Sequence, residues 1–443
     1  MFTVHEGCMY LEMIEEAGRN CMKCGFCRAS CPLFDGVETN SPRAKVRMSR
    51  AVVRGEMEAG DWYWDRVSMC LNCKTCSAEC PAGVEVDRVI LSARAEMVRR
   101  NGVGLVKGAI FHRLLPNPGL VGMLSAAASA AGRVSGINAP SNPLRFALPI
   151  AGIPRAMRLP VPAARSFLAD TPEFLPSLTG KTVARAIYFV GCAQNYIYTD
   201  AARATVSVLR KVGVDVFIPR EQVCCGTPVF NSGDVKGARA LAETNLRLFV
   251  GDAKGRLQLQ RTSRSIDVPE VDFIVTGCGS CGLTLREEWK RTLGLDGAES
   301  VSGKVVDISE LLVDRLGVSI PWAEDARPFG RVTYHDSCHL NRGMGVSAQP
   351  RKLLAAAPGV ELVEMADAAR CCGGGGAFCL YHPEESQRVA EVKMAAVAES
   401  GAQAAVTGCP SCLMQLEDSL FRRRMPQIAL HVAQALDAVM GDG

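Results

Sequence analysis

Cysteine dominates the residues of this sequence that could do chemistry. The 443-residue chain contains twenty cysteines, nine within residues 1–100 and eleven within residues 186–443. A high cysteine content is typical of short secreted disulfide scaffolds, but this chain is long and 48 % hydrophobic. Its N-terminus has no basic segment followed by an apolar segment, so no signal peptide is predicted. We therefore expect a cytoplasmic protein whose clustered thiols bind metal.

Two segments near the N-terminus share one cysteine spacing. Residues 21–32 read CMKCGFCRASCP and residues 70–81 read CLNCKTCSAECP. Both fit C-x2-C-x2-C-x3-C-P, in which three thiolates bind one [4Fe-4S] cubane and the fourth binds the other. Zinc competes, since C-x2-C pairs also build zinc sites, but two full copies with the trailing proline favour iron–sulfur. The predicted ligands are Cys21, Cys24, Cys27 and Cys80 for one cubane, and Cys70, Cys73, Cys76 and Cys31 for the other.

The C-terminal cysteines form a repeated pattern of a lone cysteine, then CCG, then C-x2-C. Five thiolates exceed the four that zinc or an ordinary cubane needs, so each copy favours a larger or distorted iron–sulfur cluster. Adjacent cysteines rarely form a disulfide with each other, because the intervening peptide strains its geometry. The two predicted sets are Cys192, Cys224, Cys225, Cys278 and Cys281, and Cys338, Cys371, Cys372, Cys409 and Cys412.

Glycine follows both cysteine pairs. The second pair stands in ARCCGGGGAFC, residues 369–379, whereas the first, VCCGTP, has a single glycine. We expect Gly226 and Gly373 to supply the positive φ of a tight turn, whose N–H groups form a nest for an anionic cluster. Ligation does not explain the glycines at 374–376, which we expect to open the second site to a substrate or partner.

Two histidines flank Cys338 in YHDSCHL. His335 and His339 could relay a proton or donate to a cluster sulfur, or they could be buried structural rings. Cys8 and Cys379 match no position of either repeat and are expected to be unligated.

One motif resembles a nucleotide site. Residues 277–282 read GCGSCG and satisfy G-x-G-x-x-G, but the repeat counterpart GCPSCL keeps only the cysteines. Cluster ligation is therefore the shared role, and no flavin or NAD site is predicted in this chain.

Alternating strands and helices must position the C-terminal cysteines. Short apolar runs alternate with helical periods, which predicts α/β units with parallel strands and cysteines at their carboxyl ends. Strands are expected at 186–192, 214–219, 272–278, 331–338, 361–365 and 404–409, and helices at 199–212, 234–250, 349–357 and 384–399.

The predicted fold is α+β and multi-domain. A helical two-cluster ferredoxin-like module spans 1–100, a Pro-rich connector 101–185, and two cysteine-repeat α/β domains 186–318 and 319–443. The connector is expected to pack on the C-terminal part or to offer a docking surface for a membrane or partner. A polar stretch at 251–270 reads as a surface insertion. The net charge of +4 gives no support for nucleic-acid binding, and no transmembrane segment is predicted.

These motifs resemble a known family. The repeated sets look like the CCG domain of heterodisulfide reductases, and the whole layout resembles the D subunit of the membrane-linked heterodisulfide reductase. It equally resembles the iron–sulfur subunits of glycolate oxidase, lactate utilisation and anaerobic glycerol-3-phosphate dehydrogenase. The resemblance implies one or two noncubane [4Fe-4S] clusters beside the two cubanes, and all ten CCG positions hold cysteine here.

Three functions follow from this resemblance and the cysteine pattern. The favoured one is an electron-transfer subunit of anaerobic metabolism, between a flavoprotein dehydrogenase of 2-hydroxy acids or similar substrates and a quinone-linked membrane partner. The second is a disulfide reductase whose catalytic site is the cluster held by Cys338, Cys371, Cys372, Cys409 and Cys412. The third is a zinc-stabilised scaffold. The first role implies a cytoplasmic chain, held at the inner face of the membrane through a partner.

Overall fold

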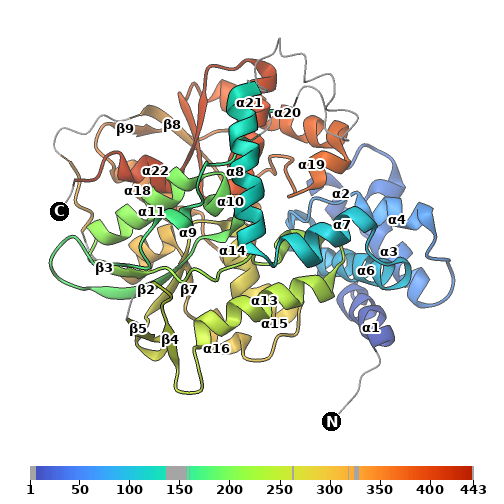
Figure 1. The fold of residues 1–443 in the computed structure, drawn as a ribbon. Coiled ribbons are helices and arrows are strands. Elements are labelled where there is room, and N and C mark those ends of the chain that lie inside the picture. The colour runs from blue at the N-terminus through green and yellow to red at the C-terminus, as the bar shows by residue number, and fades with distance from the viewer. Residues whose placement is uncertain are drawn as a thin grey trace.

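The computed structural model describes residues 6–135, 157–158, 160–261, 264–317, 319–323 and 329–441, with side chains from residue 9 (Figure 1). A helical module at the N-terminus lies beside the C-terminal part, which carries two mainly parallel sheets. The module consists of α1 (Glu6–Gly18), α2 (Phe26–Ser30), η1 (Glu38–Asn40), α3 (Pro42–Val53), α4 (Asp61–Ser68), α5 (Thr75–Ala78) and α6 (Val86–Asn101).

Helix α3 shows how the sequence sets these elements. Ser41 caps its start by accepting a hydrogen bond from the Ala44 backbone N–H at 3.0 Å, and Pro42 occupies the first turn. Val46 and Val52 face inward and join the core of the module. The helix therefore has a fixed beginning and a fixed buried face.

The first sheet has the strand order β1-β3-β2-β6-β7, in which only the β1–β3 pair is antiparallel. Its strands are β1 (Phe174–Leu175), β2 (Ala184–Phe189), β3 (Val214–Phe217), β6 (Phe273–Thr276) and β7 (Val305–Asp307). The accompanying helices are α10 (Gly191–Tyr196), α11 (Thr199–Lys211), α12 (Thr227–Asn231), α13 (Val235–Val250), α14 (Gly279–Leu283), η5 (Thr284–Glu288), α15 (Trp289–Arg291), α16 (Ala298–Ser302), α17 (Ile308–Glu310) and η6 (Leu311–Arg315).

The second sheet is all parallel and has the order β11-β10-β8-β9. Its strands are β8 (Gly330–His335), β9 (Val360–Leu362), β10 (Ala404–Thr407) and β11 (Ile428–His431). The helices of this part are η7 (His339–Gly343), α18 (Ala348–Ala356), α19 (Phe378–Tyr381), α20 (Pro383–Glu399), α21 (Pro410–Arg423) and α22 (Val432–Asp437). Strands β3, β2, β6 and β7 thus correspond in order to β9, β8, β10 and β11, which agrees with the internal repeat.

Some expected boundaries are wrong. The strand expected over 186–192 ends at Phe189, because Gly191 (φ +67°) turns the chain into α10. The strand expected over 361–365 is only β9, because the chain leaves the sheet and Met365 enters the core. Of the cysteines expected at the carboxyl ends of strands, Cys192, Cys281 and Cys412 lie beyond the strand, in the first turn of the helix that follows it. Helical N–H groups there point toward anions.

The region between the module and the first sheet packs unevenly where it is described. It contains α7 (Leu105–Ala109), η2 (Ile110–Leu114), α8 (Pro118–Ser135) and α9 (Phe167–Asp170). Phe167 and Leu168 are buried in the core, whereas within α8 only Ser129 is buried. Residues 136–156 of the predicted connector lie outside the described residues.

The expected insertion forms a short antiparallel hairpin. Strands β4 (Arg256–Gln258) and β5 (Ser265–Asp267) pair with each other and are followed by η4 (Val268–Glu270). Among the described residues, no helix is long and apolar enough to cross a membrane.

Candidate iron–sulfur sites

The first ferredoxin-type cysteine set gathers around one small cavity. Cys21, Cys24, Cys27 and Cys80 all line it, so the fourth cysteine of the second motif joins the first three of the first motif. Burial raises the pKa of the Cys27 thiol to about 11. A cationic iron centre would offset that cost, because metal binding stabilises the thiolate form.

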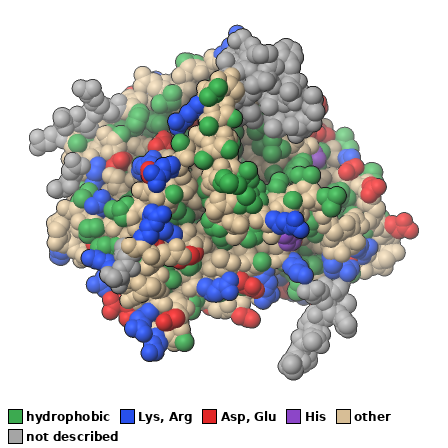
Figure 2. All heavy atoms as spheres, viewed as in Figure 1, with side chains coloured by type: hydrophobic (Ala, Val, Ile, Leu, Met, Phe, Trp, Pro, Cys, Tyr) green, Lys and Arg blue, Asp and Glu red, His purple; other side chains and the backbone are tan. Residues whose placement is uncertain are grey.

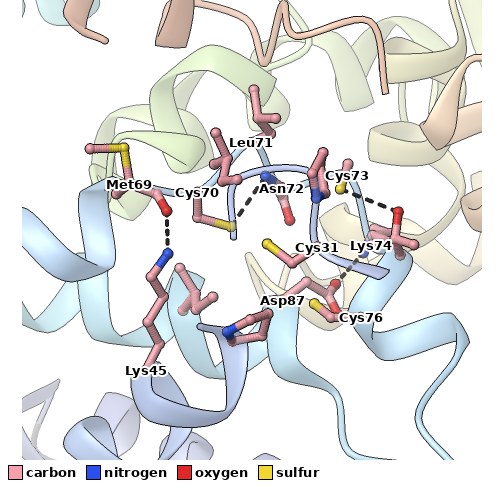
Figure 3. A pocket seen from close by; sticks show the side chains of 15 residues that line it. Cys31, Lys45, Met69, Cys70, Leu71, Asn72, Cys73, Lys74, Cys76 and Asp87 are labelled. Carbon is pink, nitrogen blue, oxygen red and sulfur yellow. Dashed lines mark hydrogen bonds and ion pairs between the residues drawn. The ribbon is translucent and has the colours of Figure 1, made fainter. Parts of the chain in front are cut away.

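The second set gathers in the same crossed manner. Cys31, Cys70, Cys73 and Cys76 line a cavity beneath the loop that follows α4 (Figure 3). The Asn72 backbone N–H donates to the Cys70 sulfur at 3.4 Å, as expected for a loop that wraps a cluster. Burial raises the pKa of Cys31 to about 11.

A buried lysine reaches this second set. Lys45 is 2 % exposed, and its Nζ donates to the Met69 carbonyl (Figure 3). Desolvation lowers its pKa, and the nearby Cys70 and Cys31 oppose that shift. A cation in this position would stabilise an anionic cluster.

The five cysteines of the first CCG set lie next to one another in the structure. The sulfur atoms of Cys192 and Cys224 lie 3.9 Å apart. Cys225 contacts both Cys224 and Cys281, and Cys281 contacts Cys278. All five predicted positions therefore lie within one succession of thiol contacts.

The second CCG set repeats this arrangement. Cys371 contacts Cys338 and Cys372. Cys412 in turn contacts Cys372 and Cys409. The structure thus brings each predicted set of five thiols together.

The glycine after each cysteine pair has the expected conformation. Gly226 and Gly373 have φ of +98° and +94°. A Cβ on Gly226 would lie 3.2 Å from the Ala238 carbonyl oxygen, and one on Gly373 would lie 2.5 Å from the Ser386 carbonyl oxygen. Both turns therefore require glycine for conformation and for space.

The additional glycines have a packing role that the sequence did not reveal. A Cβ on Gly375 would lie 2.7 Å from Leu71 Cδ2, in the loop between Cys70 and Cys73. Gly374, Gly375 and Gly376 also line a large cavity beside the second CCG set. Gly375 therefore lets the ferredoxin-type module approach this set closely.

The surroundings of His335 are consistent with a cluster in the second CCG site. Its side chain is 1 % exposed, and neither ring nitrogen has a hydrogen-bond partner among the described residues. A ring nitrogen and the sulfur atoms of Cys372 and Cys412 lie within 4.8 Å of one another. Burial, followed by the charge of Lys393, lowers the His335 pKa to about 3, so the ring is neutral at pH 7. An unpaired N–H facing clustered thiols fits a cluster whose sulfur atoms accept hydrogen bonds.

The structure gives different surroundings to the other residues that the sequence analysis noted. His339 is fully paired: its Nδ1 lies 3.0 Å from Ser280 Oγ and its Nε2 lies 3.1 Å from the Asn72 carbonyl oxygen. This ring joins both cysteine repeats to the N-terminal module and is structural. Cys379 lines the large cavity, and its sulfur donates to the Gly376 carbonyl at 3.6 Å. The Cys8 side chain lies outside the described residues.

The GCGSCG glycines serve packing between the two repeats. A Cβ on Gly279 would lie 2.6 Å from the Leu340 side chain, and one on Gly282 would lie 2.7 Å from Met344 Sδ. The Gly279 N–H also donates to the Gly408 carbonyl at 3.3 Å. These small residues let α14 and η7 approach each other.

Two thiol contacts join the separate sets. The Cys73 thiol contacts the Cys371 thiol, which links the second ferredoxin-type set to the second CCG set. The Cys278 thiol contacts the Cys409 thiol, which links the two CCG sets. The order in space is therefore ferredoxin-type module, second CCG set, first CCG set.

A cavity of about 250 Å³ opens between the two CCG sets. Thiols of both sets line it, and Met157 closes part of its wall. The Arg158 backbone N–H donates to Asp418 Oδ1 at 2.6 Å and holds that segment in place. A small molecule in this cavity would contact both CCG sets.

The sequence analysis missed buried cations around the thiols. Arg94 is buried and donates to the carbonyl oxygens of Val67, Ser68, Cys70 and Asn231. Lys393 donates to the Asp367 and Ala368 carbonyls, and burial lowers its pKa to about 8. No spacing rule identifies such residues, because their positions depend on how distant elements pack.

Comparison with known families agrees with this architecture. A family model of the cysteine-rich CCG domain matches residues 186–286 and 332–417, and one of the 4Fe-4S dicluster domain matches residues 17–84. The chain belongs to the family of iron–sulfur oxidoreductase subunits that join a 4Fe-4S dicluster domain to two CCG domains.

Curated relatives refine the class. The chain is 31 % identical to the probable glycolate oxidase iron-sulfur subunit of Bacillus subtilis, over 94 % of this chain and 93 % of the relative. It is 27 % identical to the B subunit of the fumarate reductase (CoM/CoB) of Methanothermobacter marburgensis, over 96 % of this chain and 73 % of the relative. Lactate utilization protein A of Geobacillus kaustophilus is 31 % identical over 56 % of this chain and 97 % of the relative. The predicted resemblance is confirmed.

Proposed function

We propose that this chain relays electrons between a flavoprotein dehydrogenase, acting on a 2-hydroxy acid or similar substrate, and a quinone-linked membrane partner. The observation that carries the proposal is the succession of thiol contacts from the ferredoxin-type module through Cys371 to the first CCG set. Electrons can pass from one iron–sulfur cluster to the next when the clusters are held at adjacent sites. The two cysteine sets of the module would hold cubanes, and the two CCG sets would hold one or two noncubane clusters.

Each part of the chain has a role in this proposal. Residues 1–100 form the two-cluster domain, 101–185 connect it to the CCG domains, and 186–318 and 319–443 form those domains. Iron–sulfur clusters supply one-electron redox chemistry when bound. The protein's own residues hold them, exclude water, and provide N–H donors and buried cations such as Lys45. Flavin and NAD would belong to the partner subunits, and the complex would reside on the cytoplasmic face of the membrane.

Purification of the native complex tests this role. We expect a flavoprotein to copurify with the chain, and we expect a 2-hydroxy acid to bleach the cluster absorbance under anaerobic conditions. A Cys371→Ser variant should interrupt reduction of the CCG clusters while the cubanes of the module remain spectroscopically intact. Full reduction of every cluster in that variant would contradict the proposed succession.

A second function is supported by the 250 Å³ cavity, which thiols of both CCG sets line. In this alternative, the cluster held by Cys338, Cys371, Cys372, Cys409 and Cys412 would split a disulfide. Added thiol should then shift the electron paramagnetic resonance signal of a CCG cluster, and Met157→Trp, which narrows the cavity, should abolish that shift. An unchanged signal across a range of thiols would exclude the alternative.

A further inference from the structure

A second pocket adjoins the CCG cavity and opens beside the ferredoxin-type module; the two cavities share Leu71, Asn231, Gly375 and Ala377 in their walls. It has a volume of about 280 Å³ and lies where α4, α7 and α19 meet. Cys70, a predicted ligand of the second cubane, forms part of its wall together with Leu71 and Arg94. A small molecule in this pocket would lie against a cluster ligand.

Aromatic side chains and hydrogen-bond donors line this pocket. Trp64, Phe378 and Tyr381 contribute ring surfaces, and the Lys107 ammonium lies 4.3 Å from the Tyr381 ring centroid. The His382 ring lies 4.8 Å from the Phe378 ring, between centroids, at an interplanar angle of 35°. The pocket therefore combines apolar ring walls with the Lys107 and His382 side chains and the Asp65 carboxylate, and this lining suits a planar ring that carries carbonyl oxygens.

The helices next to the pocket expose apolar side chains. Leu105 and Val106 of α7 are 95 % and 75 % exposed, and Met123 and Leu124 of α8 are 63 % and 47 % exposed. Figure 2 shows hydrophobic side chains on the face of the molecule that carries α8 and α7. Phe111 packs into the core on the opposite side, so α7 and η2 are anchored with an apolar side outward. An exposed apolar surface of this kind marks an interaction site.

The charged residues of α7 and α8 indicate what kind of surface these helices contact. The described helices α7, η2 and α8 carry Lys107, Arg113 and Arg133 and no acidic residue. Apolar side chains flanked only by basic ones are complementary to an anionic lipid surface. The exposed apolar side chains and the basic residues of α7 and α8 are therefore suited to contact such a surface.

We propose that the pocket formed by Trp64, Lys107, Phe378, Tyr381 and His382 binds the head group of a membrane quinone, and that α7 and α8 rest on the anionic bilayer that delivers it. This inference rests on the proposed electron-transfer function and places the quinone on this chain rather than on a membrane subunit. Reduction of the quinone to hydroquinone takes two electrons and two protons. The electrons derive from the hydroxy acid, which is oxidised to the oxo acid, and the protons come from water through the open pocket.

Quinone binding to the oxidised holoprotein tests the pocket without turnover. The probe is a fully substituted benzoquinone with one isoprenoid unit, which has no free ring carbon for thiol addition, measured by equilibrium dialysis. Lys107→Gln and Tyr381→Ala should each weaken binding by about tenfold, the loss expected from one hydrogen bond or ring contact. Met157→Ala, which alters only the CCG cavity, is the matched control and should bind like wild type. Absence of stoichiometric binding, or sensitivity to Met157 alone, would overturn the proposal.

Vesicle sedimentation tests the membrane surface. The holoprotein should bind phosphatidylglycerol vesicles and not phosphatidylcholine vesicles, and the double variant Leu105→Glu/Val106→Glu should lose binding. Leu178→Glu, at a surface residue that is 40 % exposed, is the control and should still bind. Equal binding by the double variant, or none by wild type, would assign this surface to a protein partner and overturn the proposal. If the clusters are reduced by a flavoprotein partner while no quinone binds, only this inference fails and the relay function stands.

Discussion

The two cysteine repeats differ at one buried position next to their thiols. Position 335 of the second copy is histidine, and the corresponding position of the first copy, before the lone cysteine, is Phe189. Phe189 packs into the apolar core, whereas His335 leaves two ring nitrogens unpaired against Cys372 and Cys412. The two CCG centres therefore have different surroundings and should differ in reduction potential.

Replacing His335 by phenylalanine should make the second site resemble the first. A donor to a cluster sulfur stabilises the more negative reduced state, so its loss should lower the reduction potential of the second CCG centre. The expected shift is about 60 mV, which for one electron corresponds to about 1.4 kcal/mol. A redox titration followed by electron paramagnetic resonance measures it, with Phe189→Leu as the control. Unchanged potentials in His335→Phe would mean that the ring does not contact the cluster.

Residue types and spacings predicted the cysteines but not their surroundings. The C-x2-C-x2-C-x3-C-P spacing led to the grouping of Cys31 with Cys70, Cys73 and Cys76, because the crossing of the fourth ligand is a property of that motif. Lys45 stands in a helix that also carries Arg43, Arg47 and Arg50, and only the tertiary packing shows that this one cation is buried near the thiols.

At the scale of elements, the turn after each cysteine pair decides whether both thiols face the same site. Gly373→Ala forces a side chain into a positive-φ turn, at a cost of about 1–3 kcal/mol, and also places its Cβ against the Ser386 carbonyl. In Gly376→Ala the new Cβ meets open space, so the substitution costs only the free energy of placing alanine at a φ of +66°. We expect Gly373→Ala to lower the thermal midpoint further than Gly376→Ala does, and to lose iron from one CCG site. Equal midpoints and equal iron contents would contradict this assignment.

Helix α22 gives the fold a dependence on pH. His431 caps this helix, is fully buried, and its Nε2–H donates to the Gly277 carbonyl of the first repeat at 2.7 Å. Burial lowers its pKa from 6.5 to about 4, so the folded protein keeps the ring neutral. The unfolded chain takes up the proton first, so this stability is complete above pH 6.5 and is lost as the pH falls toward 4.

When the pH falls from 7 to 5, protonation of His431 in the unfolded chain should lower the free energy of unfolding by about 2 kcal/mol. Anaerobic denaturant titrations at both pH values measure the loss. His431→Asn cannot take up a proton in this range, so the variant should show a smaller loss than wild type. An identical pH dependence in the two proteins would show that His431 does not titrate as described.

The elements themselves were largely predictable. Apolar runs such as AIYF and AAVT are buried on both sides, which is the pattern of central parallel strands, and they form β2 and β10. The helices expected at 199–212, 234–250 and 384–399 appear as α11, α13 and α20. The early end of β2 was missed, because a positive-φ glycine can end a strand without a change in hydrophobicity.

At the scale of the whole molecule, the contacts between parts set the order of the sites. Asn72 joins the N-terminal module to both repeats, since its side chain donates to Asn231 Oδ1 at 2.9 Å and its carbonyl lies against His339. Lys74 adds ion pairs to Asp87 and to Glu288 of the first repeat. Contacts between distant segments of this kind are invisible in a single sequence, so the position of the module against the second CCG set could not be predicted.

The proposed electron relay requires two cubanes and one or two noncubane clusters, held by adjacent cysteine sets of this chain. Mössbauer spectroscopy of the anaerobically purified, iron-57-enriched holoprotein, together with iron and acid-labile sulfide analysis, tests it most directly. We predict about 12 to 16 iron and as much sulfide per chain, with both cubane and noncubane components in the spectrum. About eight iron per chain with only cubane spectra, or zinc in place of iron, would contradict the account.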